Sequence, residues 1–338
     1  MSITKYTEIY ARLNITFDVY SGESQFSKGL DKILQDLTDA GLLVEDEGAQ
    51  IVDLKEWGLT PALIAKKDGS TLYITRDIAA AISRKKEYDL DAMYYVVGTQ
   101  QELHFRQLFK VLALMGHDWV ENCQHINFGM IKGMSTRKGN VVFLEDILDQ
   151  TAQEMHDVMR KNEEKYSQVK DPEKVADIVG LTAIVIQDMS ARRHKDYEFN
   201  WSRMLSFEGD TGPYLQYAHA RLCSVERNSG IDLVSEKADL TPKGLNLHLL
   251  PEKEAHEMIR ILAEYPDVIR RLPKDVDPVV LVTYVFRLSH AISVAWDKLW
   301  VASAPEDVKI ARMAMYRAAR IVVGNVLRIL GLKGLERM

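Results

Sequence analysis

Hydrophobic and polar positions in the first 145 residues alternate between two periods. Short apolar runs predict strands, and longer stretches with apolar residues three or four positions apart predict helices. Residues 17–20 form the first predicted strand. A helix follows and ends at Gly41, since glycine is common just past a helix C-terminus; its apolar positions are Phe26, Leu30, Ile33, Leu34 and Leu37. This alternation indicates an α/β fold.

The centre of this region predicts the sheet. Residues 93–97 are apolar throughout, as in a parallel strand that is covered on both faces, and a helix is expected from Gly98 to about Met115. Before it, a turn at residues 67–69 separates the arms of a hairpin, 62–66 and 71–74, and a helix is expected over 76–88. Residues 126–130 and 141–144 are predicted as two further strands on either side of a basic loop.

Long amphipathic helices, broken by proline and glycine, follow Glu145. The pattern therefore predicts an α/β part with a mostly parallel sheet at residues 1–145, a helical connector at 146–209 and an all-α helical bundle at 210–338. The first residues also suit a helix. They carry acidic Glu8 and no apolar core, so a signal peptide is not expected from them.

The amino-acid composition excludes several classes of protein. Hydrophobic residues make up 46% and charged residues 27%, which is typical of a globular protein. No apolar run approaches the roughly 18 residues of a membrane span, and no membrane partner is expected. The two cysteines, Cys123 and Cys223, lie outside any Cys/His cluster, so no zinc site or disulfide framework is indicated.

The net charge of −6 is unevenly distributed. Residues 1–150 account for all of it, whereas residues 309–338 carry seven basic residues and one acidic residue, Glu336. A basic segment on an acidic protein is the form of footprint that a polyanion leaves. On charge alone, a solvated helix face explains the segment better.

The segment 132–140 gathers groups suited to phosphate chemistry. It holds the cations Lys132, Arg137 and Lys138, with two hydroxyls between Gly133 and Gly139. Glycines let backbone amides approach a phosphate, and cations stabilise the charge of a pyrophosphate leaving group. A surface hairpin with solvated charges has the same composition, and composition alone favours it.

The identity of the residues in this loop favours the functional interpretation. Met134 and Ser135, followed by Arg137 and Lys138, resemble the KMSKS loop of class I aminoacyl-tRNA synthetases, and MSTRKGNVVFLEDIL resembles the version found in arginyl-tRNA synthetases. Gly133 and Thr136 stand where that motif has its two lysines. Arg137 and Lys138 are then the candidates to supply the charge.

Four other segments resemble the same family in the same order along the chain. They are DVYSGES at 18–24, YITRD at 73–77, GTQQELH at 98–104 and DTGPYLQYAHAR at 210–221. The resemblance extends over essentially the whole chain. It implies that residues 1–145 are the rear half of a catalytic nucleotide-binding domain that includes the KMSKS-like loop. It also implies that the helical connector at 146–209 contacts the stem of the tRNA and that residues 210–338 bind the anticodon.

The resemblance also implies an arginine pocket. A guanidinium group is recognised by carboxylates in fork geometry and by a flat partner. The implied residues are Tyr73, Asp77 and Gln101, with Glu23 as a further member. By spacing, Tyr73 ends a strand, Asp77 begins a helix and Gln101 follows the carboxyl end of a strand, where open α/β sheets bind ligands. The alternative for Asp77 is a charge favoured by the helix dipole, and the alternative for Tyr73 is an aromatic residue of the core. For His104, a structural histidine on the helix face is favoured over a general base.

The implied activity joins arginine to tRNA(Arg) at the expense of ATP. Met134, Ser135, Arg137 and Lys138 are the candidate catalytic residues, and Lys132, Gly133 and Gly139 would bind ATP. Mg²⁺ would accompany ATP, and neither a prosthetic group nor a protein-bound metal is expected. Positioning and charge stabilisation suffice for this chemistry, so no protein nucleophile is needed.

For tRNA, the family's helical domain supplies the contacts, and no DNA partner is expected. The candidates are Tyr217, Arg221 and Arg227 on a helix at 213–228, Trp296 on a helix at 279–301, and Arg320 in the basic last helix. Aromatic rings and arginines suit single-stranded loops, which are recognised by stacking and edge hydrogen bonds. Trp296 could equally belong to the core. Its helical spacing with Leu299 and Trp300 slightly favours the core position over a contact with tRNA.

One motif of class I synthetases is absent from the sequence. No H-x-G-H occurs, and the sequence around His117 shares only two letters with it. We therefore expect a C-terminal portion of the enzyme that is inactive alone. The alternatives are a misassigned start, or a non-catalytic tRNA-binding module or assembly subunit. The default location is the cytoplasm, with a mitochondrial form left open.

Overall fold

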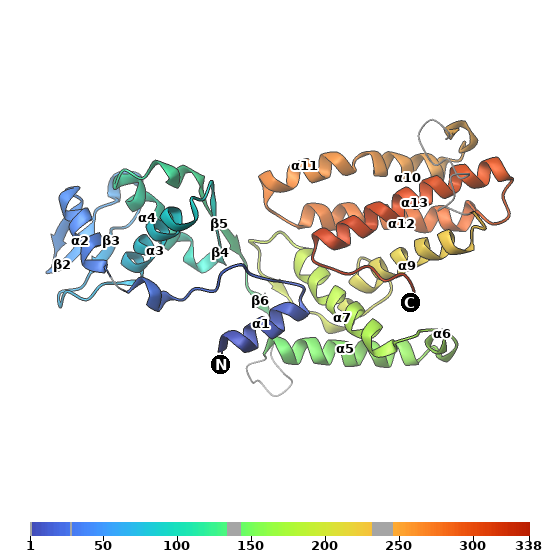
Figure 1. The fold of residues 1–338 in the computed structure, drawn as a ribbon, viewed down its shortest axis with the longest axis horizontal. Coiled ribbons are helices and arrows are strands. Elements are labelled where there is room, and N and C mark those ends of the chain that lie inside the picture. Colours follow the sequence, from blue (N-terminus) through green and yellow to red (C-terminus); the bar gives the residue numbers. More distant parts are fainter. Residues whose placement is uncertain (1, 28, 134–142, 232–245) are drawn as a thin grey trace. The chain divides into compact units, whose positions relative to one another are not determined.

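The computed structural model describes residues 2–27, 29–133, 143–231 and 246–338. It divides into two compact units (Figure 1). The α/β unit comprises Phe17–Met130 with His194–Asp196, and the helical unit comprises Met1–Thr16, Ile131–Arg193 and Tyr197–Met338. The predicted domain boundaries at 145 and 209 stay a prediction, because the units group residues by packing rather than by order along the chain.

The α/β unit contains two small sheets. Strands β1 (Leu43–Asp46), β2 (Ala49–Val52) and β3 (Ala62–Ala65) form an antiparallel sheet, and β4 (Met93–Gly98) pairs in parallel with β5 (Cys123–Phe128). The helices are α2 (Leu30–Asp39), α3 (Tyr73–Tyr88) and α4 (Glu102–Leu114), with 3-10 turns η1 (Glu23–Phe26), η2 (Lys55–Trp57), η3 (Thr99–Gln101) and η4 (Asp118–Asn122). Their apolar faces share one core, to which Leu37, Ile64, Ile78 and Leu108 belong.

The pair β4–β5 is covered unequally on its two faces. On one face, the ring of Phe105 from α4 lies 5.1 Å from that of Tyr95 and stacks 4.5 Å from that of His125. On the other face, Tyr94 is 57% exposed and Val96 67% exposed. The prediction that 93–97 is covered on both faces is therefore wrong for the described residues, although the strand and its parallel pairing are as predicted.

Three local predictions in this region are wrong. Residues 17–20 form no strand, because no neighbouring strand pairs with them in the described chain. The second arm of the hairpin reduces to one bridge between Ala65 and Thr71, after which α3 begins at once. Leu144, expected at the end of a strand, is the first residue of α5, and the Phe143 N–H is bonded to the carboxylate of Asp146 in the first turn.

The helical unit starts with α1 (Ser2–Arg12). Its later helices are α5 (Leu144–Arg160), α6 (Glu163–Ser167), α7 (Pro172–Met189), α8 (Trp201–Met204), α9 (Gly212–Asn228), α10 (Lys253–Ala263), α11 (Tyr265–Asp275), α12 (Val279–Lys298) and α13 (Glu306–Ile329), with η5 at Leu247–Leu249. Two short strands, β6 (Ile131–Lys132) and β7 (Tyr197–Glu198), pair in parallel. Arg12 joins α1 to the rest through Asp149 at 2.5 Å and Asp177 at 2.8 Å.

The core of this unit lies between α9, α10, α12 and α13, where apolar side chains such as Leu222, Val285, Ile292 and Val323 are buried (Figure 1). Helix α12 is long and apolar enough to cross a membrane by length and composition. However, 56% of its most apolar window is buried inside the unit, as expected of a core helix.

The start of α9 is fixed by capping and close packing. The Thr211 hydroxyl accepts a hydrogen bond from Tyr214 N at 3.3 Å, and Pro213 occupies the first turn. A Cβ on Gly212 would lie 2.5 Å from the backbone of Thr182 on α7, so only glycine fits there. These contacts set the position of every side chain that α9 presents.

Candidate functional site

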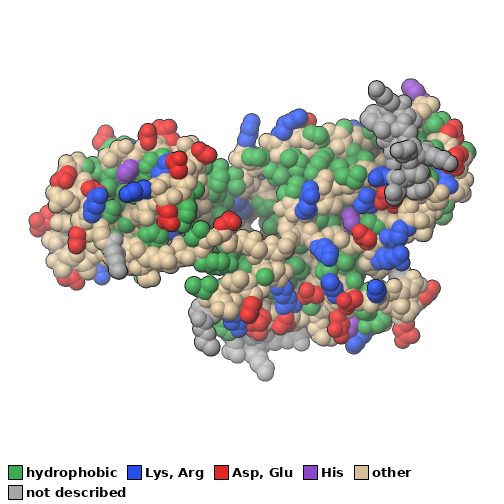
Figure 2. Space-filling view, in the orientation of Figure 1, with side chains coloured by type: hydrophobic (Ala, Val, Ile, Leu, Met, Phe, Trp, Pro, Cys, Tyr) green, Lys and Arg blue, Asp and Glu red, His purple; other side chains and the backbone are tan. Residues whose placement is uncertain are grey.

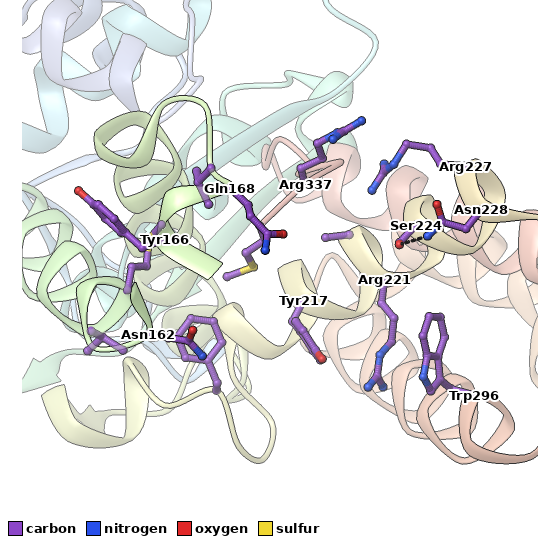
Figure 3. Close-up of a pocket in the computed structure, with 16 residues that line it drawn as sticks. Asn162, Tyr166, Gln168, Tyr217, Arg221, Ser224, Arg227, Asn228, Trp296 and Arg337 are labelled. Atoms are coloured by element: carbon purple, nitrogen blue, oxygen red, sulfur yellow. Dashed lines mark hydrogen bonds between the residues drawn. The ribbon is translucent and has the colours of Figure 1, made fainter. Parts of the chain in front are cut away.

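A groove of about 1100 Å³ lies in the helical unit (Figure 3). One side comes from α9 and α12, the opposite side from the end of α5 and from α6 with the residues after it, and the chain end closes it. The lining residues are Val158, Met159, Asn162, Tyr166, Gln168, Val169, Phe207, Tyr217, Ala220, Arg221, Ser224, Arg227, Asn228, Trp296, Arg337 and Met338. Four of the five residues predicted to contact tRNA belong to this lining: Tyr217, Arg221, Arg227 and Trp296.

Three of these side chains form a stack. The guanidinium carbon of Arg221 lies 4.9 Å from the ring centre of Tyr217 and 4.5 Å from that of Trp296. Tyr217 and Arg221 are four residues apart on α9 and so share one helix face. Trp296 is partly buried against the core of the unit and also lines the groove, and its predicted contact with tRNA stays a prediction.

The groove carries positive charge. Among the described residues, three arginines line it and no Asp or Glu side chain does, in a chain whose net charge is −6. The visible face of the α/β unit, by contrast, carries more acidic than basic side chains (Figure 2). Arginine side chains that line a groove attract a polyanion, and aromatic rings beside them can stack on planar groups.

Buried polar groups of α9 hold the chain end beside the groove. Gln216 donates to Lys333 O and to Thr182 Oγ1, both at 2.8 Å, and accepts from Leu335 N at 2.9 Å. The His219 Nδ1 lies 2.8 Å from Leu335 O, and burial lowers the pKa of this imidazole. Arg227 donates to Glu336 O at 2.9 Å, so it positions the chain end as well as lining the groove.

Arg320 lies elsewhere. Its Nε is 2.5 Å from a carboxylate oxygen of Glu226, which also pairs with Arg317 at 3.7 Å, and Arg320 does not line the groove. The structure therefore gives this side chain an ion pair between α13 and α9. Its predicted contact with tRNA stays a prediction.

The wall formed by α5 and α6 was not predicted. Tyr166 is anchored there because its hydroxyl lies 2.8 Å from Nε2 of His156, which is buried on α5. Asn162 and Gln168 add amide side chains to this wall. No motif marks these residues, although the connector at 146–209 as a whole was expected to contact the stem of the tRNA, which stays a prediction.

In the α/β unit, Tyr73 and Asp77 both lie on α3, one turn apart. The prediction that Tyr73 ends a strand is therefore wrong: buried Thr75 donates to Ile64 O at 2.7 Å and draws the helix start to residue 73. Tyr73 is 68% exposed, so the core alternative for its ring is wrong too, and the guanidinium of Arg76 lies 5.6 Å from the ring centre.

His104 connects α4 to this part of α3. Its Nε2 lies 2.7 Å from Asp77 Oδ2, in a contact that the spacing did not predict. Gln101 comes at the end of η3, one turn before His104, directly after β4. The structure thus gathers Asp77, His104 and the start of α4 beside the carboxyl end of a parallel strand.

The remaining predicted residues are only partly described. Glu23 begins η1, and its side chain lies outside the described residues. Met134, Ser135, Arg137, Lys138 and Gly139 lie outside them entirely. Lys132 ends β6, and Gly133 follows with φ +76°, a left-handed conformation that suits glycine. Among the described residues, no group of three His, Cys, Asp or Glu side chains could hold a metal ion.

Comparison with known proteins decides the family. Residues 1–201 match the family model of the class I (R) tRNA synthetase catalytic domain. The chain belongs to the class I arginyl-type tRNA synthetases. Residues 215–338 match the DALR anticodon binding domain, so the predicted fold class, an α/β catalytic part followed by a helical domain, is confirmed.

Relatives of this synthetase chain agree. It is 52% identical over 339 residues to a probable cytoplasmic arginine–tRNA ligase of Dictyostelium discoideum, and 51% identical over 343 residues to the cytoplasmic arginine–tRNA ligase of Saccharomyces cerevisiae. These alignments cover 100% of this chain but 56% and 55% of the relatives. The mitochondrial ligase of S. cerevisiae is 46% identical, with 100% and 52% covered. The chain thus spans about half the length of these relatives.

Solved structures share the synthetase fold. Arginyl-tRNA synthetase from Plasmodium falciparum superposes with a TM-score of 0.86 at 21% identity, covering 100% of this chain and 57% of that one. The Thermus thermophilus enzyme gives 0.83 at 21% identity, covering 98% and 62%. In this synthetase chain the groove combines residues of the anticodon-binding match with residues from before it, 158–207.

Proposed function

We propose that this chain functions in arginine–tRNA ligation, with tRNA(Arg), arginine and ATP as its substrates, and that its groove binds single-stranded nucleotides of the tRNA. The stack of Tyr217, Arg221 and Trp296, in a groove whose described lining holds no Asp or Glu side chain, carries this proposal. A base stacked on an aromatic side chain contributes about 1–3 kcal/mol. The arginines beside the stack are suited to the backbone phosphates.

The α/β unit would bind the amino acid. His104 is bonded to Oδ2 of Asp77, so this contact orients the carboxylate that would pair with a guanidinium group. Tyr73 offers an exposed ring for stacking, and Gln101 lies at the start of α4. His104 thereby acts as a positioning residue for Asp77, and Glu23 is a further candidate for the pocket.

The chemistry follows from the substrates. A carboxylate oxygen of arginine attacks the α-phosphorus of ATP, and pyrophosphate leaves. The terminal ribose hydroxyl of tRNA then attacks the carbonyl carbon of arginyl-adenylate, and AMP leaves. Lys132, Gly133 and Gly139 would cradle ATP with its Mg²⁺, and Met134, Ser135, Arg137 and Lys138 would stabilise the charge of the leaving group. The names of its relatives favour a cytoplasmic location, with a mitochondrial form as the alternative.

Because the sequence holds no H-x-G-H motif, we expect the 338-residue chain alone to bind tRNA without charging it. The test measures charging of tRNA(Arg) with labelled arginine beside filter binding of the same tRNA. Binding without charging is the expected result. Robust charging would overturn the expectation of inactivity, and absence of tRNA binding would overturn the proposed groove function. Binding that does not distinguish tRNA(Arg) from other tRNAs would favour a general tRNA-binding module.

A further inference from the structure

The polar side chains that line the groove differ in how far their hydrogen-bonding capacity is satisfied. On α9, the amide of Asn228 donates to Ser224 Oγ at 3.2 Å, so this pair already satisfies part of its hydrogen-bonding capacity. Arg227 is bonded to the chain end. On the opposite wall, the amide of Gln168 makes no hydrogen bond with the described residues, yet it lines the groove.

The backbone of Gln168 is nevertheless fixed. Val169 N donates to Tyr166 O at 3.1 Å, and Tyr166 N donates to Asn162 O at 2.9 Å, so Gln168 sits in a closed turn. The same tyrosine is held at its hydroxyl by the imidazole of His156, which is 7% exposed. An open amide on an anchored turn is arranged for recognition, because little of its backbone must be ordered when a ligand binds.

The amide also points into the groove that the stack lines. Figure 3 shows the amide end of Gln168 directed from the α6 side into the groove, with Tyr217, Arg221 and Trp296 on the opposite side. A base held on the stack would therefore have an edge in the same groove as the amide. A glutamine amide offers a donor and an acceptor side by side, which matches a base edge with an adjacent acceptor and donor, as in adenine.

We infer that Gln168 is a specificity-determining residue, which hydrogen-bonds the edge of one base of the tRNA loop held on the Tyr217–Arg221–Trp296 stack. This inference rests on the proposed function of the groove. It assigns base recognition to a residue outside the anticodon-binding match, which begins at residue 215. The stack supplies affinity that tolerates any base, and the amide supplies the discrimination.

The experiment uses tRNA(Arg) transcripts in which each anticodon-loop nucleotide in turn is replaced by the other three bases. Filter binding to the 338-residue chain gives a preference at every position. At one position the wild type should prefer its base roughly 5- to 150-fold, the equivalent of about 1–3 kcal/mol. Gln168→Met should reduce that preference to less than about twofold and leave the other positions unchanged.

Two further variants separate recognition from folding and from the stack. Gln168→Glu replaces the amide donor by an acceptor and should move the preference toward a base with two adjacent donors, a change that a purely structural role would not cause. Gln150→Met removes an exposed amide on α5 that is bonded to Glu154 and lies outside the groove, and it should change nothing.

Arg221→Met should weaken every transcript alike, because it removes the stacked cation that all of them share. If Arg221→Met weakens binding while Gln168→Met and Gln168→Glu keep the wild-type preference, the inference about Gln168 is overturned and the groove function stands. If the wild type binds no transcript, both fail.

Discussion

The helical unit and the α/β unit differ in how completely their apolar side chains are buried. In the helical unit, α9, α12 and α13 enclose a core, and two residues that line the groove are held by partners: Arg227 by Glu336 O and Tyr166 by His156. In the α/β unit, one face of β4–β5 leaves Tyr94, Val96 and Phe128 exposed, although parallel strands are usually covered on both faces. The candidate site of the helical unit is therefore a groove lined by described residues. In the α/β unit, by contrast, the residues predicted to bind arginine, such as Tyr73, lie at an open surface.

Shortening one buried leucine in each core should change the free energy of unfolding more than any other change considered, and it tests whether the two units unfold independently. Leu222→Ala in the helical unit and Leu108→Ala in the α/β unit both empty fully buried positions and should each lower the free energy of unfolding by about 2–5 kcal/mol. Hydrogen exchange followed by mass spectrometry should show faster exchange only in the unit that carries the change. Equal acceleration in both units for either variant would mean that they unfold together.

Removal of the charge of Asp77 should weaken arginine binding by roughly 10- to 150-fold, since hydrogen bonds to charged groups contribute about 1.5–3 kcal/mol. Equilibrium dialysis with labelled arginine compares Asp77→Asn with Asp91→Asn, a matched change at an exposed residue of the same unit. His104→Gln should have a smaller effect, because it disturbs only the orientation of the carboxylate. Wild-type affinity in Asp77→Asn would show that this open surface does not bind arginine.

The smallest effect concerns buried His219. Burial lowers its pKa in the folded state, so the unfolded state takes up a proton first, at about pH 6.5, and stability is lost as the pH falls below that value. His219→Asn removes the titrating ring and keeps an N–H close to Nδ1. Relative to this variant, the wild-type helical unit should lose up to about 1.4 kcal/mol per pH unit between pH 6.5 and the lowered pKa.

Denaturant unfolding of both proteins at pH 7.5 and pH 5.5 measures this difference. Arg320 and Glu336, the charged groups near His219, are present in both, so their own titration cancels. A difference in unfolding free energy that is the same at both pH values would show that His219 titrates alike in the folded and unfolded states.

The hydrophobic pattern correctly predicted those elements whose own residues carry a clear strand or helix period. The strand at 93–97, its parallel partner and the helix at 213–228 appear nearly where the sequence places them. The misses depend on distant contacts. Residues 17–20 have strand-like composition but no neighbouring edge, and the start of α3 at Tyr73 is set by the bond from Thr75 to Ile64, eleven residues away.

The candidate sites show the same division. Tyr217, Arg221 and Trp296 were singled out one by one, and the structure shows them stacked together. Gln168 and the contact between His104 and Asp77 could not be predicted, because no local signal marks a residue whose role arises only from packing of separate helices. Their roles in binding stay predictions.

The order of the units along the chain affects how the protein is made. The α/β unit is inserted between α1 and the rest of the helical unit. Arg12 of α1 is bonded to Asp177, which is synthesised 165 residues later. At about 5–20 residues per second, a ribosome needs roughly 8–33 s to supply that partner. During this time α1 lacks Asp177, its partner in the helical unit, while the inserted α/β unit can already fold. The α/β unit is thus expected to fold before the helical unit is complete, and α1 to dock late.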